Sequence, residues 1–114
     1  MTTQQARQAL YGEALDIIGR EYAANLRLPG LARRIGASER ALQRAFAEHG
    51  ELSFSDELRS RRLEVAARLL RGTDMPVGAI ARRVGYGGHA PFTKAFHRQH
   101  GMSPRAYAAR AEAC

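Results

Sequence analysis

Cysteine is nearly absent from this 114-residue chain, which has Cys114 as its single example, and tryptophan is missing altogether. One cysteine cannot form an internal disulfide, so a disulfide-stabilised extracellular fold is not expected. No run of about 18 apolar residues occurs, and no membrane span is therefore expected. The first residues, MTTQQARQAL, lack the basic start and apolar core of a signal peptide. These absences predict a cytoplasmic protein with no membrane partner.

Groupings of residues that carry catalysis are also missing. The sequence has no Ser-His-Asp grouping, no glycine-rich phosphate loop and no clustered pair of carboxylates. His97 and His100 lie three residues apart, which suits a metal on a helix, but no nearby carboxylate or thiol completes a ligand set except Cys114. We therefore expect no catalytic residue, no enzyme activity, no cofactor and no metal site.

Negative charge is scarce relative to positive charge. Eleven acidic residues face 18 basic ones, which gives a net charge of +7, and Lys94 is the one lysine among the basic residues. A balance of this kind favours an anionic partner, nucleic acid first. Because a basic composition can also have no function, this interpretation depends on a motif.

A long helix is predicted over Ser53–Gly72, SFSDELRSRRLEVAARLLRG. Ser53 and Asp56 form a capping-box pattern, and Gly72 is placed to end the helix in the left-handed conformation. The apolar positions fall in two stripes, which are Leu63, Ala66, Ala67 and Leu70, and Phe54, Leu58, Val65 and Leu69. Two stripes predict contacts on two sides, as for a helix between two small bodies.

A repeated motif flanks this helix. LARRIG (31–36) and ALQRAF (41–46) precede it, and IARRVG (80–85) and PFTKAF (91–96) follow it. A supersecondary unit used twice predicts two similar bodies. An N-terminal helix over Thr3–Ala24 and a last helix over Pro104–Ala111, capped by Ser103, complete the prediction of helices.

Each copy fits a helix-turn-helix. In the first copy Gly36 permits a positive φ in the turn, and Ser38 is a good N-cap for a helix over 38–49. The buried stripe of that helix is Ala41, Leu42, Ala45 and Phe46, and the opposite face is Arg40, Gln43, Arg44 and Ala47. Arg and Gln side chains on an exposed helix suit the base edges of a major groove.

The second copy repeats the scheme with a longer turn. Ile80, Ala81 and Val84 pack, and Gly85-Tyr86-Gly87 forms the turn, with Gly87 as the expected cap of a helix over 88–100. Its buried positions are Phe92, Ala95 and Phe96, and its outward positions are His89, Thr93, Lys94 and His97. Four aromatic residues could be read as stacking platforms for single strands, but their helical spacing predicts core positions; they are Phe46, Phe92, Phe96 and Tyr107.

At this point the chain resembles the C-terminal DNA-binding region of the AraC/XylS family of bacterial transcription regulators. The similarity covers about Asp16 to Arg110 and is carried by LARRIGASERALQRAF, RRLEVAARLL, IARRVGYGGHAPFTKAF and GMSPRAY. The resemblance implies an all-α, homeodomain-like fold of about seven helices, with two recognition helices in successive major grooves. We expect three parts, 1–52, 53–72 and 73–114, of which the middle one is the linker helix.

The resemblance also implies site residues. The base-reading positions match Arg40, Gln43, Arg44, His89, Thr93 and Lys94. Arginines expected at phosphates are Arg33, Arg34, Arg59, Arg82, Arg83 and Arg98. The alternatives are a solvated first face paired with Glu39 or Glu48, and phosphate contact alone for the second face. Arg62, between the two apolar stripes, is expected either at a phosphate or in an internal ion pair.

The sequence thus predicts a specific regulator that binds double-stranded DNA on the nucleoid. It is expected to be a monomer, because it has no sustained heptad and two readers in one chain remove the usual need for a dimer. Either it is a stand-alone regulator, or it is the DNA-binding part of a longer protein. The rival interpretations are a nonspecific, architectural nucleic-acid binder and a protein-interaction module, for instance one held to RNA polymerase.

Overall fold

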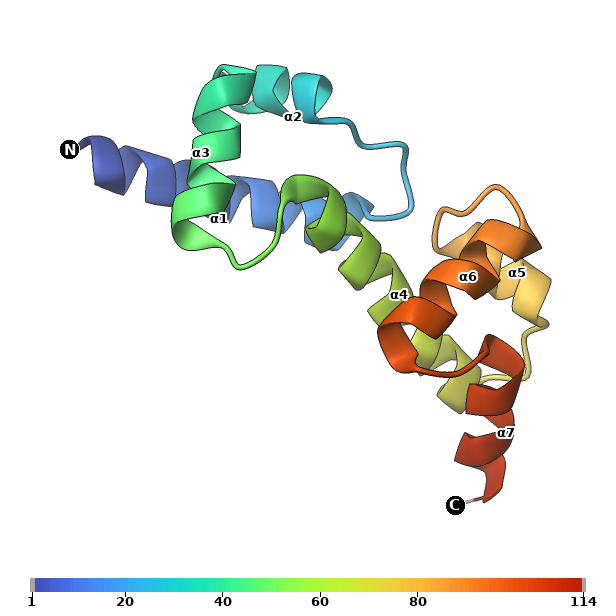
Figure 1. Cartoon of the computed structure of the whole chain (residues 1–114). Helices are drawn as coiled ribbons and strands as arrows, with labels where there is room; N and C mark the ends of the chain where they lie inside the picture. The colour runs from blue at the N-terminus through green and yellow to red at the C-terminus, as the bar shows by residue number, and fades with distance from the viewer. Residues whose placement is uncertain (1, 114) are drawn as a thin grey trace. The chain divides into compact units, whose positions relative to one another are not determined.

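The computed structural model describes residues 2–113, with side chains to residue 112, and contains seven α-helices and no strand over that range (Figure 1). This confirms the all-α prediction. Cys114, considered above as a metal ligand, lies outside the described residues. Over the same range no helix is both long enough and apolar enough to cross a membrane. The helices are α1 (Thr3–Glu21), α2 (Leu28–Ile35), α3 (Glu39–His49), α4 (Phe54–Gly72), α5 (Val77–Arg83), α6 (His89–His100) and α7 (Pro104–Ala113).

The chain divides into two compact units, Met1–Arg59 and Ser60–Cys114, and the boundary falls within α4. The first six residues of α4 therefore belong to the first unit and the remainder to the second. The three-part division into 1–52, 53–72 and 73–114 stays a prediction.

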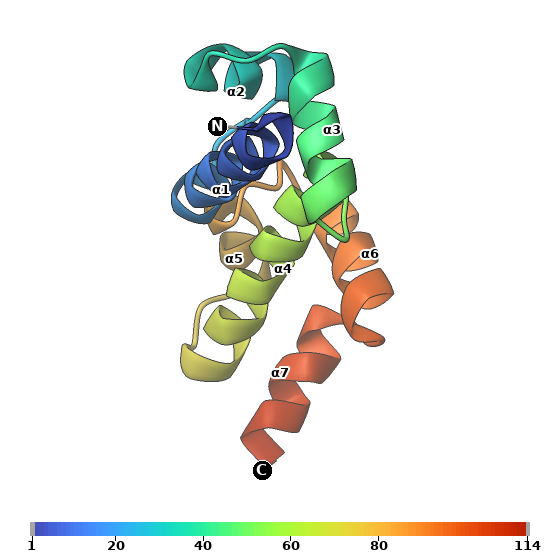
Figure 2. The same cartoon turned by 90° about the vertical axis from the view of Figure 1, so that its left-hand side faces the viewer.

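The first unit contains α1, α2, α3 and the start of α4, which Figure 2 shows as ribbons. The buried side chains of these helices form one apolar core. Every one of these helices contributes buried side chains at the spacing of a helical face. The core residues are Ala14, Ile17, Ile18, Leu31, Ala32, Leu42, Ala45, Phe46, Phe54 and Leu58. The α1 helix ends at Glu21, three residues before the predicted Ala24, because a turn closed by the Ala24 N–H and the Glu21 carbonyl (2.9 Å) reverses the chain there.

The turn of the first helix-turn-helix forms as its residues predict. Gly36 has φ +83°, the left-handed conformation that glycine adopts without steric cost. The Ser38 hydroxyl then caps α3 by accepting a hydrogen bond from the Ala41 N–H at 3.1 Å. Local chemistry therefore fixes where α3 begins, and with it which side chains face outward.

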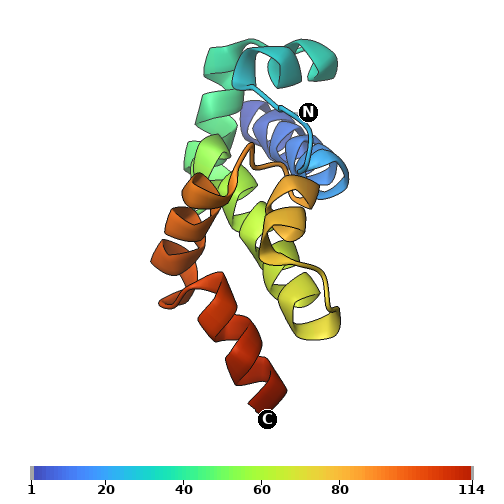
Figure 3. The same ribbon diagram turned by 90° about the vertical axis from the view of Figure 1, so that its right-hand side faces the viewer.

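The second unit packs the remainder of α4 with α5, α6 and α7 (Figure 3). Its buried residues are Leu63, Ala66, Ala67, Leu70, Ile80, Ala81, Val84, Phe92, Phe96 and Pro104. Polar contacts tie α4 to its neighbours, since Arg71 donates to the Tyr107 hydroxyl and the Gln99 amide donates to the Ser60 carbonyl at 3.4 Å. The Ser103 hydroxyl caps α7 by accepting from the Ala106 N–H at 3.1 Å, as predicted.

The α4 helix differs from its prediction in two respects. The second predicted stripe is not uniformly buried. Phe54 and Leu58, at the start of the helix, are buried in the first unit, whereas Val65 and Leu69 are half-buried. The prediction of a left-handed stop at Gly72 is wrong, since positive φ among the described glycines occurs at 36, 85 and 101. The last turn is closed instead by Thr73, whose hydroxyl donates to the Leu69 carbonyl at 2.7 Å.

The start of α6 also differs by one residue. Its N-cap is Gly88, not the predicted Gly87, and a glycine cannot supply a side-chain cap. The turn places its positive φ (+105°) at Gly85, and three residues, Tyr86, Gly87 and Gly88, then lead to the first residue of α6. Pro91 falls in the first turn of α6, where its missing N–H removes little.

Candidate nucleic-acid interface

The outward face of α3 brings together the three residues predicted to read bases. Arg40, Gln43 and Arg44 are all exposed, and together with Ala47 they line a surface depression of about 490 Å³. The opposite face of the helix packs in the core through Leu42, Ala45 and Phe46, all of which are buried. The phase of α3 is therefore set by burial, and burial holds this polar set toward solvent.

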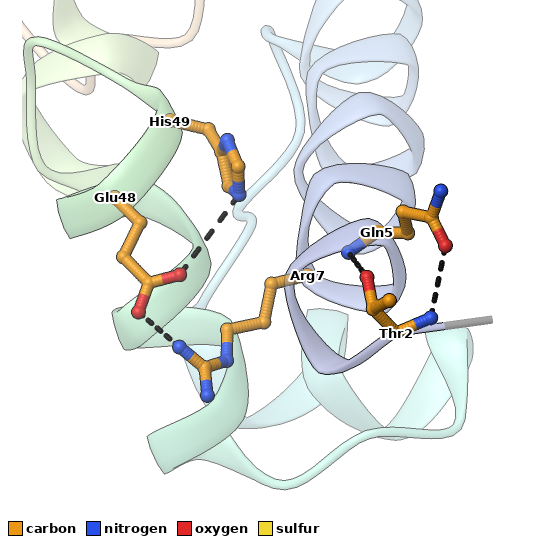
Figure 4. A network of polar contacts seen from close by, with 5 residues as sticks. All are labelled: Thr2, Gln5, Arg7, Glu48 and His49. Atoms are coloured by element: carbon orange, nitrogen blue, oxygen red, sulfur yellow. Dashed lines mark hydrogen bonds and ion pairs between the residues drawn. The ribbon is translucent and has the colours of Figure 1, made fainter.

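The alternative that this face is neutralised by its own carboxylates does not fit the structure. Glu48 forms an ion pair with Arg7 of α1, and its other carboxylate oxygen lies 3.9 Å from His49 Nε2 (Figure 4). Within the part of the chain that the structure describes, neither Arg40 nor Arg44 has a carboxylate at ion-pair distance. Both guanidiniums therefore keep their donors available for a ligand.

Figure 4 also shows how the end of α1 beside this pair is fixed. The Thr2 hydroxyl accepts from the Gln5 N–H at 3.1 Å, and the Thr2 N–H donates to the Gln5 side chain at 2.9 Å. This reciprocal capping box orders the first turn of α1, the helix that carries Arg7. No sequence pattern indicates the pair of Arg7 with Glu48, because the two residues lie 41 positions apart.

The outward face of α6 is assembled differently. His89 and Lys94 are exposed, whereas Thr93 is half-buried, and its hydroxyl lies 3.3 Å from His89 Nδ1. This hydrogen bond occupies one ring nitrogen of His89, so Nε2 is the ring nitrogen that remains to bind a ligand. The second face thus offers one permanent cation and two coupled polar groups, in contrast to the two arginines of α3.

The six arginines expected at phosphates fall into two groups. Arg33, Arg82, Arg83 and Arg98 are exposed. Arg34 and Arg59 are also exposed but have carboxylate partners, Glu21 through two hydrogen bonds of 2.8 and 2.7 Å, and Asp56 at 2.6 Å. The hydrogen bonds from Arg34 lower the pKa of Glu21, and the same bonds raise the pKa of Arg34.

Arg62 is half-buried within the second unit. Its guanidinium lies over the Tyr86 ring, 5.9 Å from the centroid, and burial lowers its pKa while the nearby Tyr86 opposes that shift. Such a cation–π contact joins α4 to the turn between α5 and α6. Arg62 therefore supports the second helix-turn-helix from inside, through a contact with Tyr86 that no sequence pattern indicates.

Three of the four aromatic residues predicted in the core are there, since Phe46, Phe92 and Phe96 are buried. Tyr107 is half-buried, with its ring 5.4 Å from that of Phe96. Tyr11 was missed, although its ring packs edge-on against Phe46 at 5.2 Å. Burial raises the Tyr11 pKa, and the nearby carboxylates of Glu57 and Glu51 raise it further.

Comparison with known proteins gives the same picture as the fold and the exposed faces. A family model described as a helix-turn-helix domain matches residues 31–110. The regulatory protein SoxS of Escherichia coli K12 is 35% identical over 82 residues, which cover 72% of this chain and 77% of SoxS. The first curated relatives are longer, and the chain spans about a third of their length (37% and 35%).

Two solved structures show how closely the fold agrees. The C-terminal domain of AraT, a response regulator from Geobacillus stearothermophilus, superposes with a TM-score of 0.85 at 31% identity, covering 89% of this chain and 84% of that domain. The DNA-binding domain of the global transcriptional factor AdpA, solved in complex with a target DNA, superposes with a TM-score of 0.82 at 28% identity and covers 91% and 93%. Two helix-turn-helix units around a shared helix define the class of protein. The chain belongs to the AraC/XylS family of transcription regulators.

Proposed function

We propose that this chain binds double-stranded DNA in a sequence-specific manner and regulates transcription, with α3 and α6 reading successive segments of the major groove. The observation that carries the proposal is the outward face of α3, where Arg40, Gln43 and Arg44 are exposed and lie together. Arg donates two hydrogen bonds to guanine, and Gln can pair with adenine. The AdpA domain, which is similar over nearly its whole length, was solved on a target DNA.

The second face supports a weaker and different reading role. Lys94 is exposed, and His89 presents one ring nitrogen because the other contacts Thr93. Unlike readers imply a site with two unlike parts, in which α3 supplies most of the discrimination. The remaining cations, Arg33, Arg82, Arg83 and Arg98, are exposed and suit phosphates, which fix position but carry no sequence information.

The test is to select bound duplexes from random DNA and then compare wild type with Arg44→Ala on the selected site and on a scrambled duplex at several salt concentrations. A lost bidentate contact should cost about 1–3 kcal/mol on the selected site and relax preference at one or two base pairs. Arg83→Ala is the matched control, expected to weaken both duplexes alike and to lower the salt slope by about one. An equal loss on both duplexes for Arg44→Ala would favour the nonspecific, architectural rival.

RNA polymerase is proposed as the second partner. The regulator would contact it while bound to DNA in the nucleoid, which lies in the cytoplasm. Support comes from similarity to regulators such as the transcriptional activator RhaR of Yersinia pseudotuberculosis, which is 32% identical over 111 residues. Transcription in a purified system with and without the selected site tests this role. An effect that persists without the site would indicate an interaction module and not a DNA-directed regulator.

A further inference from the structure

A cavity beside the reading helix has no role in the function proposed above. It has a volume of about 420 Å³ and lies within the first unit, between α3, the turn that follows it and the start of α4. Small-molecule sites commonly occupy about 300–1,000 Å³, so the volume suits a compact organic molecule. Its apolar walls come from Leu28, Phe46, Leu52 and Phe54.

Leu52 marks this cavity as unusual on the surface. It is 40% exposed, and no other large apolar side chain among residues 2–112 is exposed to that degree. Single exposed leucines need no explanation in general, but this one lies beside a cavity whose other apolar walls, Phe46 and Phe54, belong to the core. An apolar body placed there would bury Leu52 and extend the core of the first unit.

The charge of the cavity is opposite to that of the chain. Among the described residues that line it, Glu51 is the one with a charged side chain, although the whole chain carries +7. Burial raises the pKa of the neighbouring Tyr11, and the carboxylates of Glu57 and Glu51 raise it further, so two acidic side chains lie near this turn. A cationic group on the ligand is therefore favoured here, and a carboxylate is disfavoured.

We infer that the cavity between α3 and α4 binds a small organic cation. The ligand has an apolar, preferably aromatic body that fills the cavity and a protonated amine that pairs with Glu51. Coupling to DNA, which rests on the proposed function, follows from Gln43, since this residue lines both the cavity and the reading face. Its amide cannot cover a ligand and pair with a base at the same time. Ligand and specific DNA therefore weaken each other, and the effect is reciprocal.

The binding test uses three probes with one apolar body, 4-phenylbutylammonium, neutral 4-phenylbutan-1-ol and anionic 4-phenylbutyrate, followed by amide NMR shifts of the full chain. The cation should bind about threefold tighter than the alcohol, the scale of a partly exposed charge pair, and the acid should bind most weakly. Shifts should concentrate at residues 43–55. Equal affinities, or shifts spread over the arginine-rich surfaces, would overturn the inference.

Two variants and a control locate the charge and the apolar wall. Glu51→Gln should abolish the preference for the cation and keep binding of the alcohol, whereas Glu13→Gln, which removes an exposed charge on α1, should change neither. Leu52→Ala should weaken all three probes. A cation preference that survives Glu51→Gln would contradict the assignment.

The coupling test measures DNA binding with saturating 4-phenylbutylammonium at constant ionic strength. Affinity for the selected duplex should fall about threefold or more, with little change for the scrambled duplex, and Gln43→Ala should remove the difference. An equal change on both duplexes would overturn the coupling. If the protein without ligand fails to distinguish the duplexes, the proposed function fails, while the NMR titration still decides the cavity.

Discussion

Arg34 donates two hydrogen bonds to the two carboxylate oxygens of Glu21, at 2.8 and 2.7 Å, and thereby joins α2 to the end of α1. Both side chains are substantially exposed, so this bidentate pair contributes little to stability. The Arg34–Glu21 pair instead lowers the positive charge that is available to bind DNA phosphates. An arginine expected at a phosphate is already held by an anion, and DNA must compete for it.

Removal of Glu21 should release that charge. Glu21→Gln is expected to raise affinity for scrambled DNA and to steepen its salt dependence by up to about one phosphate contact. Glu13→Gln removes the same formal charge from an exposed position on the same helix and should have the smaller effect. Salt titrations of both variants decide this, and identical slopes would show that Arg34 does not reach a phosphate.

The same pair predicts a pH dependence. The hydrogen bonds from Arg34, and then its charge, lower the pKa of Glu21 below its ordinary value of 4.5. A depressed carboxyl pKa stabilises the fold at pH values above the unfolded pKa, and that contribution is lost as pH falls through the folded pKa. Carboxyl NMR titration of Glu21 should show a lower midpoint in wild type than in Arg34→Ala. A midpoint that does not move would contradict the pairing in solution.

Core substitutions should separate buried from exposed leucine. Leu42 is fully buried, whereas Leu52 is 40% exposed. Leu42→Ala should therefore lower the free energy of unfolding by about 2–5 kcal/mol, because it leaves a cavity, and Leu52→Ala by less than about 1 kcal/mol. Phe46→Ala and Phe96→Ala should resemble the first case. Denaturant unfolding measures all four, and similar values for the two leucines would mean that the phase of α3 is wrong.

Two glycines at helix ends should respond in opposite directions to alanine. Gly36 has φ +83°, so Gly36→Ala should cost about 1–2 kcal/mol although a Cβ would have space. Gly72 lies in the last turn of α4 without a positive φ and with no neighbour near a Cβ. Gly72→Ala should therefore stabilise by about 0.4–1 kcal/mol. Thermal melting of the two variants tests both expectations. If Gly72→Ala destabilised the protein, Gly72 would have a positive φ after all.

The isolated chain should sediment as a monomer. Large apolar side chains are mostly covered over residues 2–112, with Leu52 the exposed exception, and two reading helices in one chain remove the usual need for a two-fold partner. Sedimentation velocity at micromolar concentration tests this expectation. A tight dimer would contradict it, and Leu52→Asp would then show whether Leu52 lies in the interface.

The sequence by itself determined the seven helices, the turn at Gly36 and the buried face of α3. These features depend on local interactions, such as the positive φ of Gly36, the cap of Ser38 and the 3.6-residue spacing that buries Leu42 and Phe46. The prediction was wrong where two adjacent residues could both end a helix. The end of α4 was expected at a left-handed Gly72, but the Thr73 hydroxyl closes the last turn instead.

Only the tertiary structure decided which charged groups are available and where a cavity remains. The partners of Arg7 and Arg34 lie 41 and 13 positions away, and no periodic pattern relates residues at such separations. The cavity beside Leu52 likewise arises because α3, its following turn and α4 leave space between them. Side-chain pairing and packing voids depend on distances between helices, which the fold sets and local sequence does not.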